Sequence, residues 1–213
     1  MLKKLLVTSL ASLSLAMAGT LTLDDFSVAQ GPGALSGSGS AAAVAIGGGV
    51  TRAQALTSIP GGVAPTEHSL SSTGGAGGIL DITNGLGDDS TVVITYTLPG
   101  ALAIPVGSTN VQLTLLIVGS DGNPTSVTLG GTAGVSGAFA IPGNTIGQTV
   151  PFGVTIPVGP GTITMTFDGS AGWDLGIDSI GFSWTDPQTT VPEPGTYAMI
   201  GLGLAGLAFL RRK

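Results

Sequence analysis

The stretch Thr162-Ile163-Thr164-Met165-Thr166-Phe167 alternates polar and apolar residues at every position. This period of two is typical of a half-buried β-strand, with the apolar side chains on one face. Residues 91–98, 111–118 and 150–158 alternate in a similar way, and turns rich in glycine and proline separate them. Pro151 and Pro157 place part of the third segment at a sheet edge or in a surface loop. The pattern predicts an all-β fold, a β-sandwich or jelly roll.

The first part of the predicted domain is less regular. Residues 31–78 are rich in glycine, alanine and serine and show weak periodicity. We expect this region to be rich in loops, with two or three strands near residues 42–46, 51–57 and 79–83. No exact repeat is found, which argues against a solenoid.

Composition excludes several classes of protein. The chain has 213 residues, no cysteine, one histidine and a net charge of −6. These numbers exclude disulfides, cysteine-based zinc sites and thiol chemistry, and they argue against nucleic-acid binding, which needs lysine and arginine. Within residues 19–190, Arg52 is the only basic residue against eleven acids, which gives a net charge of about −10. We therefore expect Arg52 to form a structural ion pair, although anchoring a ligand is an alternative.

The N-terminus has the features of a secretory signal peptide, predicted to cover residues 1–18. Lys3 and Lys4 precede an apolar stretch over residues 5–16. Ala16 and Ala18 frame a small-x-small cleavage site around Met17. A buried N-terminal helix is the alternative interpretation.

The C-terminus contains three features in order. The tetrapeptide Val191-Pro192-Glu193-Pro194 comes first, an apolar run over residues 196–210 follows, and Arg211-Arg212-Lys213 ends the chain. As a helix the apolar run would span about 22 Å at ~1.5 Å per residue, whereas a full membrane span needs ~20 residues. Lys and Arg favour the cytoplasmic side of a membrane, so we expect the main domain on the opposite side.

This tail resembles the PEP-CTERM sorting signal of Gram-negative bacteria. The resemblance implies recognition and processing by a membrane enzyme, the exosortase, while the short helix is transiently in the inner membrane. It also implies export to the cell surface or to the extracellular polymer matrix. A plain C-terminal membrane anchor is the alternative. The predicted organisation is thus a signal helix, a β-sandwich domain over residues 19–190, and a sorting tail over residues 191–213.

Two acidic spots coincide with slips in the apolar pattern. Apolar residues occupy positions 21 and 23 and then 26 and 28, with Asp24-Asp25 at the slip. They also occupy positions 175 and 177 and then 180, 182 and 184, with Asp178-Ser179 at the slip. A slip of one residue turns the following side chains to the other face unless a bulge absorbs it. We therefore predict bulges at both spots, and pairing of the first and last strands would make them neighbours.

These two segments also resemble the ends of galactose-binding-like jelly-roll domains. The matching residues are 23–26 and 173–180, with looser matches at residues 46–52 and at Asn84-Gly85. The resemblance implies a sugar-binding concave face and one structural calcium ion near the chain ends. Carboxylates are suitable calcium ligands, and the candidates are Asp24, Asp25, Asp174 and Asp178. The alternative is that these residues form turns and keep the protein soluble.

Catalytic signals are weak. The sequence has no GxSxG motif, and the single histidine, His68, lies beside Glu67 in a glycine-rich region where a surface position is expected. We therefore predict no enzymatic activity and no required cofactor. The predicted function is a structural or adhesive protein of the cell envelope or extracellular matrix. One alternative is a carbohydrate-binding module that contacts matrix polysaccharide, and a second is a secreted hydrolase with paired carboxylates.

Overall fold

A computed structural model describes residues 18–30, 35–36, 38–59, 68–155, 159–187, 195, 199–204, 207 and 211. The predicted signal peptide up to residue 17, Ala16 included, lies outside the described residues. So do the motif residues Val191, Pro192, Glu193 and Pro194 and the basic residues Arg212 and Lys213.

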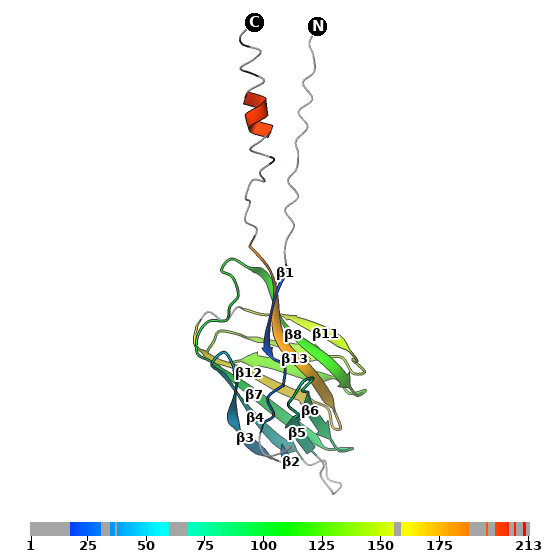
Figure 1. Ribbon diagram of the computed structural model, residues 1–213. Coiled ribbons are helices and arrows are strands. Elements are labelled where there is room, and N and C mark those ends of the chain that lie inside the picture. Colours follow the sequence, from blue (N-terminus) through cyan, green and yellow to red (C-terminus); the bar gives the residue numbers. More distant parts are fainter. Residues whose placement is uncertain are drawn as a thin grey trace.

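The described residues form an all-β domain, as predicted (Figure 1). Its strands are β1 (Ala18–Asp24), β2 (Leu35–Ser36), β3 (Gly39–Gly47), β4 (Val50–Ile59), β5 (His68–Ser72), β6 (Leu80–Asn84), β7 (Asp89–Leu98), β8 (Thr109–Ser120), β9 (Thr125–Gly130), β10 (Gly137–Ile141), β11 (Gln148–Gly153), β12 (Gly161–Gly169) and β13 (Leu175–Thr185).

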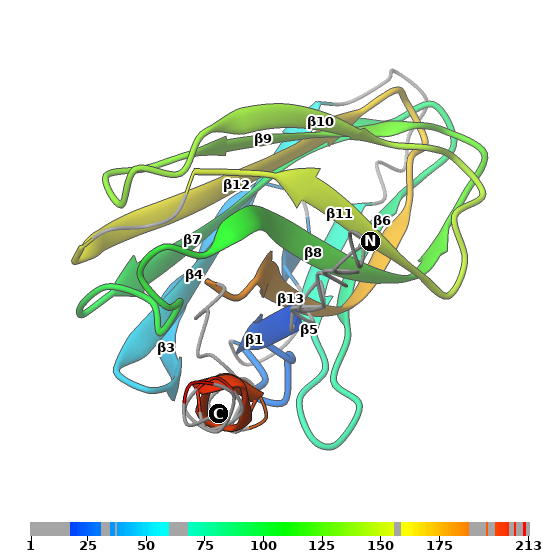
Figure 2. The same ribbon diagram turned by 90° about the horizontal axis from the view of Figure 1, so that it is seen from above.

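These strands form two antiparallel sheets, which confirms the sandwich prediction. We name the seven-stranded sheet, in the order β11-β8-β13-β6-β5-β2 with β1 also on β13, sheet A. The six-stranded sheet, in the order β10-β9-β12-β7-β4-β3, is sheet B. Figure 2 shows the strands of sheet B following one another in this order along one layer.

The last strand, β13, organises sheet A. It pairs with β8 on one side, and on the other side it pairs first with β6 and then with β1. Ala18 is opposite Thr185 in the pairing of β1 with β13, so the first and last strands are neighbours, as predicted. The chain therefore enters and leaves the domain at the same end (Figure 1).

The predicted bulges are found close to the two acidic spots. The pairing of β13 with β8 shifts between Ile177 and Ser179, which confirms the bulge at Asp178. The pairing of β1 with β13 shifts between Thr22 and Asp24, one position earlier than predicted. β1 then ends at Asp24, and the buried Phe26 adopts a left-handed conformation with a φ of 51°. A turn with an unusual backbone, and not a continued strand, thus explains the second pair of apolar residues.

The core lies between the two sheets and follows the alternation in the sequence. In β12, Ile163, Met165 and Phe167 are fully buried, whereas the intervening threonines are half-buried on the outer face. Trp173 is fully buried just before β13, and its indole N–H donates to the Ser90 carbonyl at 3.1 Å. Because the same period of two holds along β7, the sheet presents one face to the core and one to solvent.

The four alternating segments of the sequence all contain strands. β7, β8 and β12 cover three of them, and the fourth begins as β11, an edge strand of sheet A that contains Pro151 and ends at Gly153. The strands expected near residues 42–46, 51–57 and 79–83 are found as β3, β4 and β6, and β3 and β4 are longer than expected. The short strands β2, β5, β9 and β10 were not predicted.

Candidate functional site

The pairing of β1 with β13 places the two ends of the described sandwich, Ala18 and Thr185, opposite each other. The predicted cleavage site ends at Ala18, the first residue of β1, and the sorting motif begins six residues after Thr185. At ~3.3–3.6 Å per extended residue, six residues reach at most about 20 Å. A processing enzyme acting at the motif would therefore work close to the folded domain.

Trp184 covers this end of the sandwich. Its indole N–H donates to the Asp186 carboxylate at 2.6 Å, and its ring packs across Gly19 of β1. A Cβ atom at Gly19 would overlap the Trp184 ring, so only glycine fits opposite this tryptophan. The residue that follows the predicted cleavage site is therefore part of the folded structure.

The described part of the C-terminal tail is helical and apolar. Residues 199–204 are helical, and the large apolar side chains of the tail are 55–70% exposed: Met199, Ile200, Leu202, Leu204 and Leu207. The amide of Arg211 donates to the Leu207 carbonyl at 3.2 Å. Among the described residues, no helix is both long enough and apolar enough to span a membrane.

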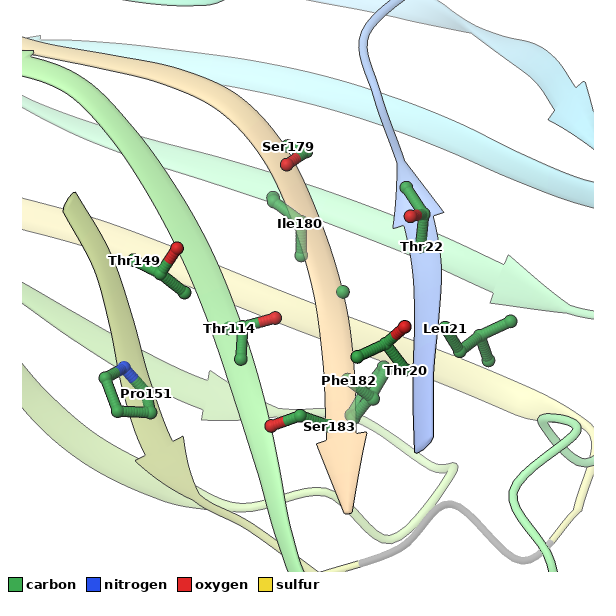
Figure 3. A pocket seen from close by; sticks show the side chains of 11 residues that line it. Thr20, Leu21, Thr22, Thr114, Thr149, Pro151, Ser179, Ile180, Phe182 and Ser183 are labelled. Atoms are coloured by element: carbon green, nitrogen blue, oxygen red, sulfur yellow. The ribbon is translucent and has the colours of Figure 1, made fainter. Parts of the chain in front are cut away.

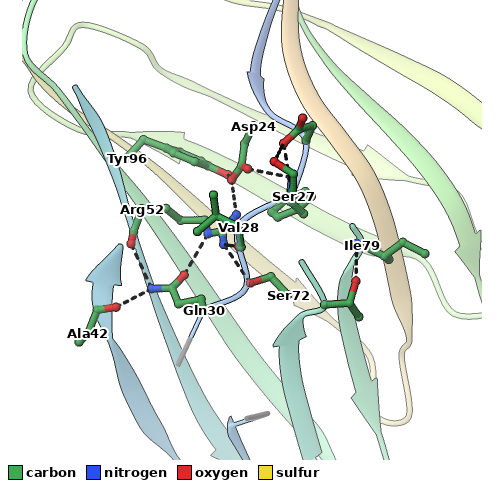
Figure 4. A network of polar contacts seen from close by, with 12 residues as sticks. Asp24, Ser27, Val28, Gln30, Ala42, Arg52, Ser72, Ile79 and Tyr96 are labelled. Carbon is green, nitrogen blue, oxygen red and sulfur yellow. Dashed lines mark hydrogen bonds and ion pairs between the residues drawn. The ribbon is translucent and has the colours of Figure 1, made fainter. Parts of the chain in front are cut away.

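Arg52 on β4 is the centre of a buried polar network (Figure 4). Its Nη1 donates to Asp24 Oδ2 at 2.7 Å, and Tyr96 Oη donates to the same oxygen at 2.9 Å. The side chain of Arg52 is fully buried and that of Asp24 is 2% exposed. This geometry confirms the prediction of a structural ion pair. Burial and the negative charge of Asp24 raise the pKa of Tyr96 well above its usual value, so the phenol stays protonated as a donor.

The other donors of Arg52 are satisfied as well. Its Nε donates to Gln30 Oε1 at 3.0 Å, and Nη2 donates to Ser72 Oγ at 2.9 Å and to the Val28 carbonyl at 2.5 Å. The guanidinium carbon lies 5.1 Å from the centre of the Phe26 ring, within cation–π distance. The network joins the segment after β1 to β4 and β7 of sheet B and to β5 of sheet A, so it links the two sheets.

Sequence reasoning identified Arg52 but missed its partners Gln30, Ser72 and Tyr96. The sequence of β4 contained one indication that Arg52 is buried. Arg52 and Gln54 lie on the same face of the strand as the buried Leu56, and small or hydroxyl residues occupy the other face. A strand that points an arginine into the core needs an acid there. The sequence alone does not show which of eleven acids it is.

The four calcium candidates have different environments. The Asp24 carboxylate is engaged by Arg52, and Asp25 caps a turn by accepting from the Ser27 amide at 3.0 Å and from its hydroxyl at 2.5 Å. These hydrogen bonds lower the pKa of Asp25. Asp24 is opposite Ile180, six residues along β13 from Asp174, which corresponds to about 20 Å at ~3.3 Å per residue.

The remaining candidates do not complete a calcium site. Asp174 accepts from the Asn84 amide at 2.7 Å, and Asp178 occupies the bulge in β13. Within the part of the chain that the structure describes, no three acidic or histidine side chains are placed to hold a metal ion. The residues described thus do not fit the structural calcium that the jelly-roll resemblance implies.

An open depression of about 310 Å³ lies on the outer face of sheet A (Figure 3). It crosses β1, β13, β8 and β11, and most of its polar lining consists of hydroxyl groups from Thr20, Thr22, Thr114, Thr149, Ser179 and Ser183. Such a surface can exchange hydrogen bonds with a neutral, hydroxyl-rich ligand.

A second open depression, of about 550 Å³, lies farther along the same sheet. Asp81, Asp121 and Asp174 are among its lining residues. Burial raises the pKa values of Asp81 and Asp174, and the neighbouring carboxylates contribute to the shift at Asp174. The acidic charge of this depression contrasts with the uncharged lining of the first.

The described aromatic side chains do not form a sugar platform. Phe26, Tyr96, Phe167 and Trp173 are fully buried, and the other aromatic residues of the sandwich are mostly buried. Phe139 is half-buried and packs against Phe152, with ring centres 4.6 Å apart. Exposed aromatic rings, which commonly stack on sugars, are therefore not found among the described residues.

Comparison with known proteins identifies the tail. Residues 190–213 match the PEP-CTERM protein-sorting motif, which confirms the resemblance seen in the sequence. This motif implies export and sorting to the cell surface, and exosortase processing recognises such tails.

The sandwich domain shows a weaker similarity to known proteins than the tail does. The search of curated proteins produced no match. A similar solved structure is the family 11 carbohydrate-binding module of the cellulosomal cellulase Lic26A-Cel5E of Clostridium thermocellum, with 12% sequence identity and a TM-score of 0.35. The similarity covers 81% of this chain and 98% of that chain. At this TM-score the likeness carries no conclusion about what the present chain binds.

Proposed function

We propose that this chain is an exported, exosortase-processed protein whose β-sandwich serves as a non-enzymatic structural or adhesive module at the cell surface or in the extracellular matrix. The observation that carries the proposal is the sorting motif at residues 190–213, joined within six residues to the last strand of a folded sandwich. The tail directs sorting, and the sandwich is the part that is displayed outside the cell.

The arrangement of the termini supports this function. Because β1 and β13 are neighbours, the signal peptide and the sorting tail enter the membrane from the same end of the domain. The opposite end and both sheet faces then point away from the membrane. A folded domain held in this way can be presented at a surface without rearranging its core.

The polar residues of the domain also favour a structural role. The buried ion pair between Arg52 and Asp24 is enclosed by Tyr96, Gln30 and Ser72 and holds the two sheets together. The outer face of sheet B carries mainly threonine and alanine, which gives the displayed protein a low-charge surface.

Replacing Pro192, Glu193 and Pro194 with alanine tests the proposal. We expect the variant to accumulate, unprocessed, in the inner membrane, whereas the unaltered chain reaches the surface. Replacing Gln188 and Thr189 with alanine is the matched control, because it alters the same linker outside the matched residues 190–213. Cell fractionation and accessibility to added protease give the location. Equal surface exposure of the motif variant and the control would contradict the sorting role.

Polysaccharide contact is a second candidate, favoured by the hydroxyl-lined depression on sheet A. A polysaccharide would there exchange hydrogen bonds with threonine and serine side chains. Affinity electrophoresis in gels that contain the matrix polysaccharide tests it. Retardation that is lost when Thr114 and Ser183 are both replaced with valine would support it, and equal mobility with and without the polysaccharide would contradict it.

A further inference from the structure

The charged residues of sheet B lie on its central strands β4, β7 and β12. Asp81, Asp121, Asp174 and Asp178 lie on or beside sheet A. On the described strands of sheet B, the outward-facing charged residues are Asp89 and Asp168, which lie near one end. Arg52 of β4 points into the core. The edge strands β3 and β10 of sheet B thus carry no charged residue, although the domain is strongly acidic.

The outer face of sheet B is a ladder of threonines. Thr97 pairs with Thr51 on one side and with Thr162 on the other, and Thr95 pairs with Thr164. Thr166 continues the ladder to Thr128 on β9. The ladder thus crosses the four central strands of the sheet, β4, β7, β12 and β9.

Both edge strands of sheet B lack charged residues and prolines. β3 has the sequence Gly-Ser-Ala-Ala-Ala-Val-Ala-Ile-Gly and β10 has Gly-Ala-Phe-Ala-Ile, so neither contains a charged residue or a proline. Among the described strands, none pairs with the outer side of either one. Natural proteins normally protect exposed edges with charges, prolines or bulges, because an unpaired edge is a template for another strand. One of these devices is present on β3: its pairing with β4 is irregular between Ala41 and Val44 and again between Ala45 and Gly47.

The directions of these two strands fit each other. All neighbouring strands of sheet B are antiparallel, and with six strands the two edges run in opposite directions. A second copy moved sideways, without turning over, would place its β10 antiparallel to β3. The copies would keep the same orientation, so their sorting tails would leave from the same side. This arrangement suits molecules attached to one surface.

We propose that copies of this chain associate head to tail, with β3 of one copy pairing with β10 of the next, to form rows that share a continuous sheet B. The second copy is favoured as the occupant because two domains of net charge about −10 repel each other least where their edges are uncharged. A repeated head-to-tail interface does not close on itself and so gives an open row. The inference rests on the structural role proposed above and gives it a mechanism of assembly.

The absence of cysteine from the chain provides a direct test. Ser40 and Ala45 of β3 and Ala138 and Ala140 of β10 are exposed and face outward, opposite Ala55, Thr51, Thr128 and Ser126. Paired strands bring opposite Cα atoms to about 4.5–5.5 Å, within the range that a disulfide needs. Full-length chains with one cysteine on each edge, such as Ser40→Cys with Ala138→Cys and Ala45→Cys with Ala140→Cys, are displayed on cells and oxidised.

We expect at least one edge pair to give a ladder of dimers, trimers and longer species on non-reducing gels. The matched control carries Ala55→Cys and Thr128→Cys, one strand inward from each edge, where the two thiols of neighbouring copies would be about 10 Å farther apart. Each single-cysteine variant should remain monomeric, and coexpressed Ser40→Cys and Ala138→Cys chains should stop at dimers.

Three outcomes would overturn the inference: monomers only from all edge pairs, a ladder of equal strength from the control, or dimers from the β3 single-cysteine variants, which would indicate a closed β3–β3 pair. Protease accessibility measured on the same cells separates this failure from failure of the sorting proposal. Surface-exposed chains without a ladder refute the rows alone. Chains retained inside refute the sorting role, and the cross-linking is then read on the purified full-length protein.

Discussion

Replacing Arg52 with methionine should destabilise the domain severely. Methionine resembles the arginine stem in shape but leaves the Asp24 carboxylate buried with, among the described residues, the Tyr96 hydroxyl and the Phe26 amide as its remaining donors. The carbonyl of Val28 also loses a charged donor. Breaking a buried pair by removing one partner costs about 3–5 kcal/mol. Because a domain of this size loses about 2–4 °C of Tm per kcal/mol, we expect Tm to fall by roughly 6–20 °C.

Urea unfolding of residues 19–190, followed by tryptophan fluorescence, measures this loss. Trp173 and Trp184 are both buried and so report unfolding. The matched control is Gln54→Met on the same strand, because Gln54 Nε2 is buried without a hydrogen-bond partner among the described residues. We expect this control to be neutral or stabilising, since it removes an unsatisfied donor.

The double variant Arg52→Met with Asp24→Asn tests whether the pair acts as a unit. Removing both charges should cost clearly less than the sum of the two single changes, because no unpaired charge is left in the core. A loss below about 1 kcal/mol for Arg52→Met, or strict additivity in the double variant, would refute the assigned role of the ion pair.

Three further predictions concern other parts of the domain. Gly19→Val should cost about 1–3 kcal/mol in urea unfolding through overlap with Trp184, while Thr20→Val should cost much less; equal effects would contradict the packing. Asp174→Asn should raise Tm at pH 7 and change it little at pH 3, while the contact with the Asn84 amide is kept. Burial raises the pKa of Asp174 in the folded state, so its ionisation above that pKa opposes folding. The same change in Tm at both pH values would contradict this reasoning. Calcium or EDTA should leave Tm unchanged, because the predicted ligands are not assembled; a calcium-dependent rise, about 2.7 kcal/mol at a hundredfold excess over Kd, would restore the calcium site.

A strand could be predicted wherever polar and apolar residues alternate over six or more positions. β7, β8 and β12 bury alternate side chains, and their sequences show it directly. The short strands β9 and β10 gave too few periods to stand out among glycine-rich turns. β3 was only partly predicted, because alanine and glycine carry little of the hydrophobic contrast that marks a buried face.

The sorting tail was easier to predict from the sequence than the buried polar network around Arg52. The sorting tail is read by another protein as a linear motif, so residues 190–213 carry the information in their order alone. The Arg52 network depends on contacts between positions 20 to 72 residues apart, such as Tyr96 with Asp24. Local sequence indicates that a buried arginine needs an acid, but only the pairing of strands selects Asp24.

The edge strands of sheet B, β3 and β10, are the basis for the proposed rows of copies. The hydroxyl-lined depression of sheet A is open, and its residues could be exposed in any sandwich. By contrast, the edge strands β3 and β10 of this acidic domain contain neither a charged residue nor a proline. Their hydrogen-bonding edges are therefore open to another strand, and two copies repel each other least there. Because sheet B has six antiparallel strands in all, its two edge strands run in opposite directions, and neither carries a charged residue. Lateral pairing between copies therefore requires no change in the fold that the Arg52 network already holds together.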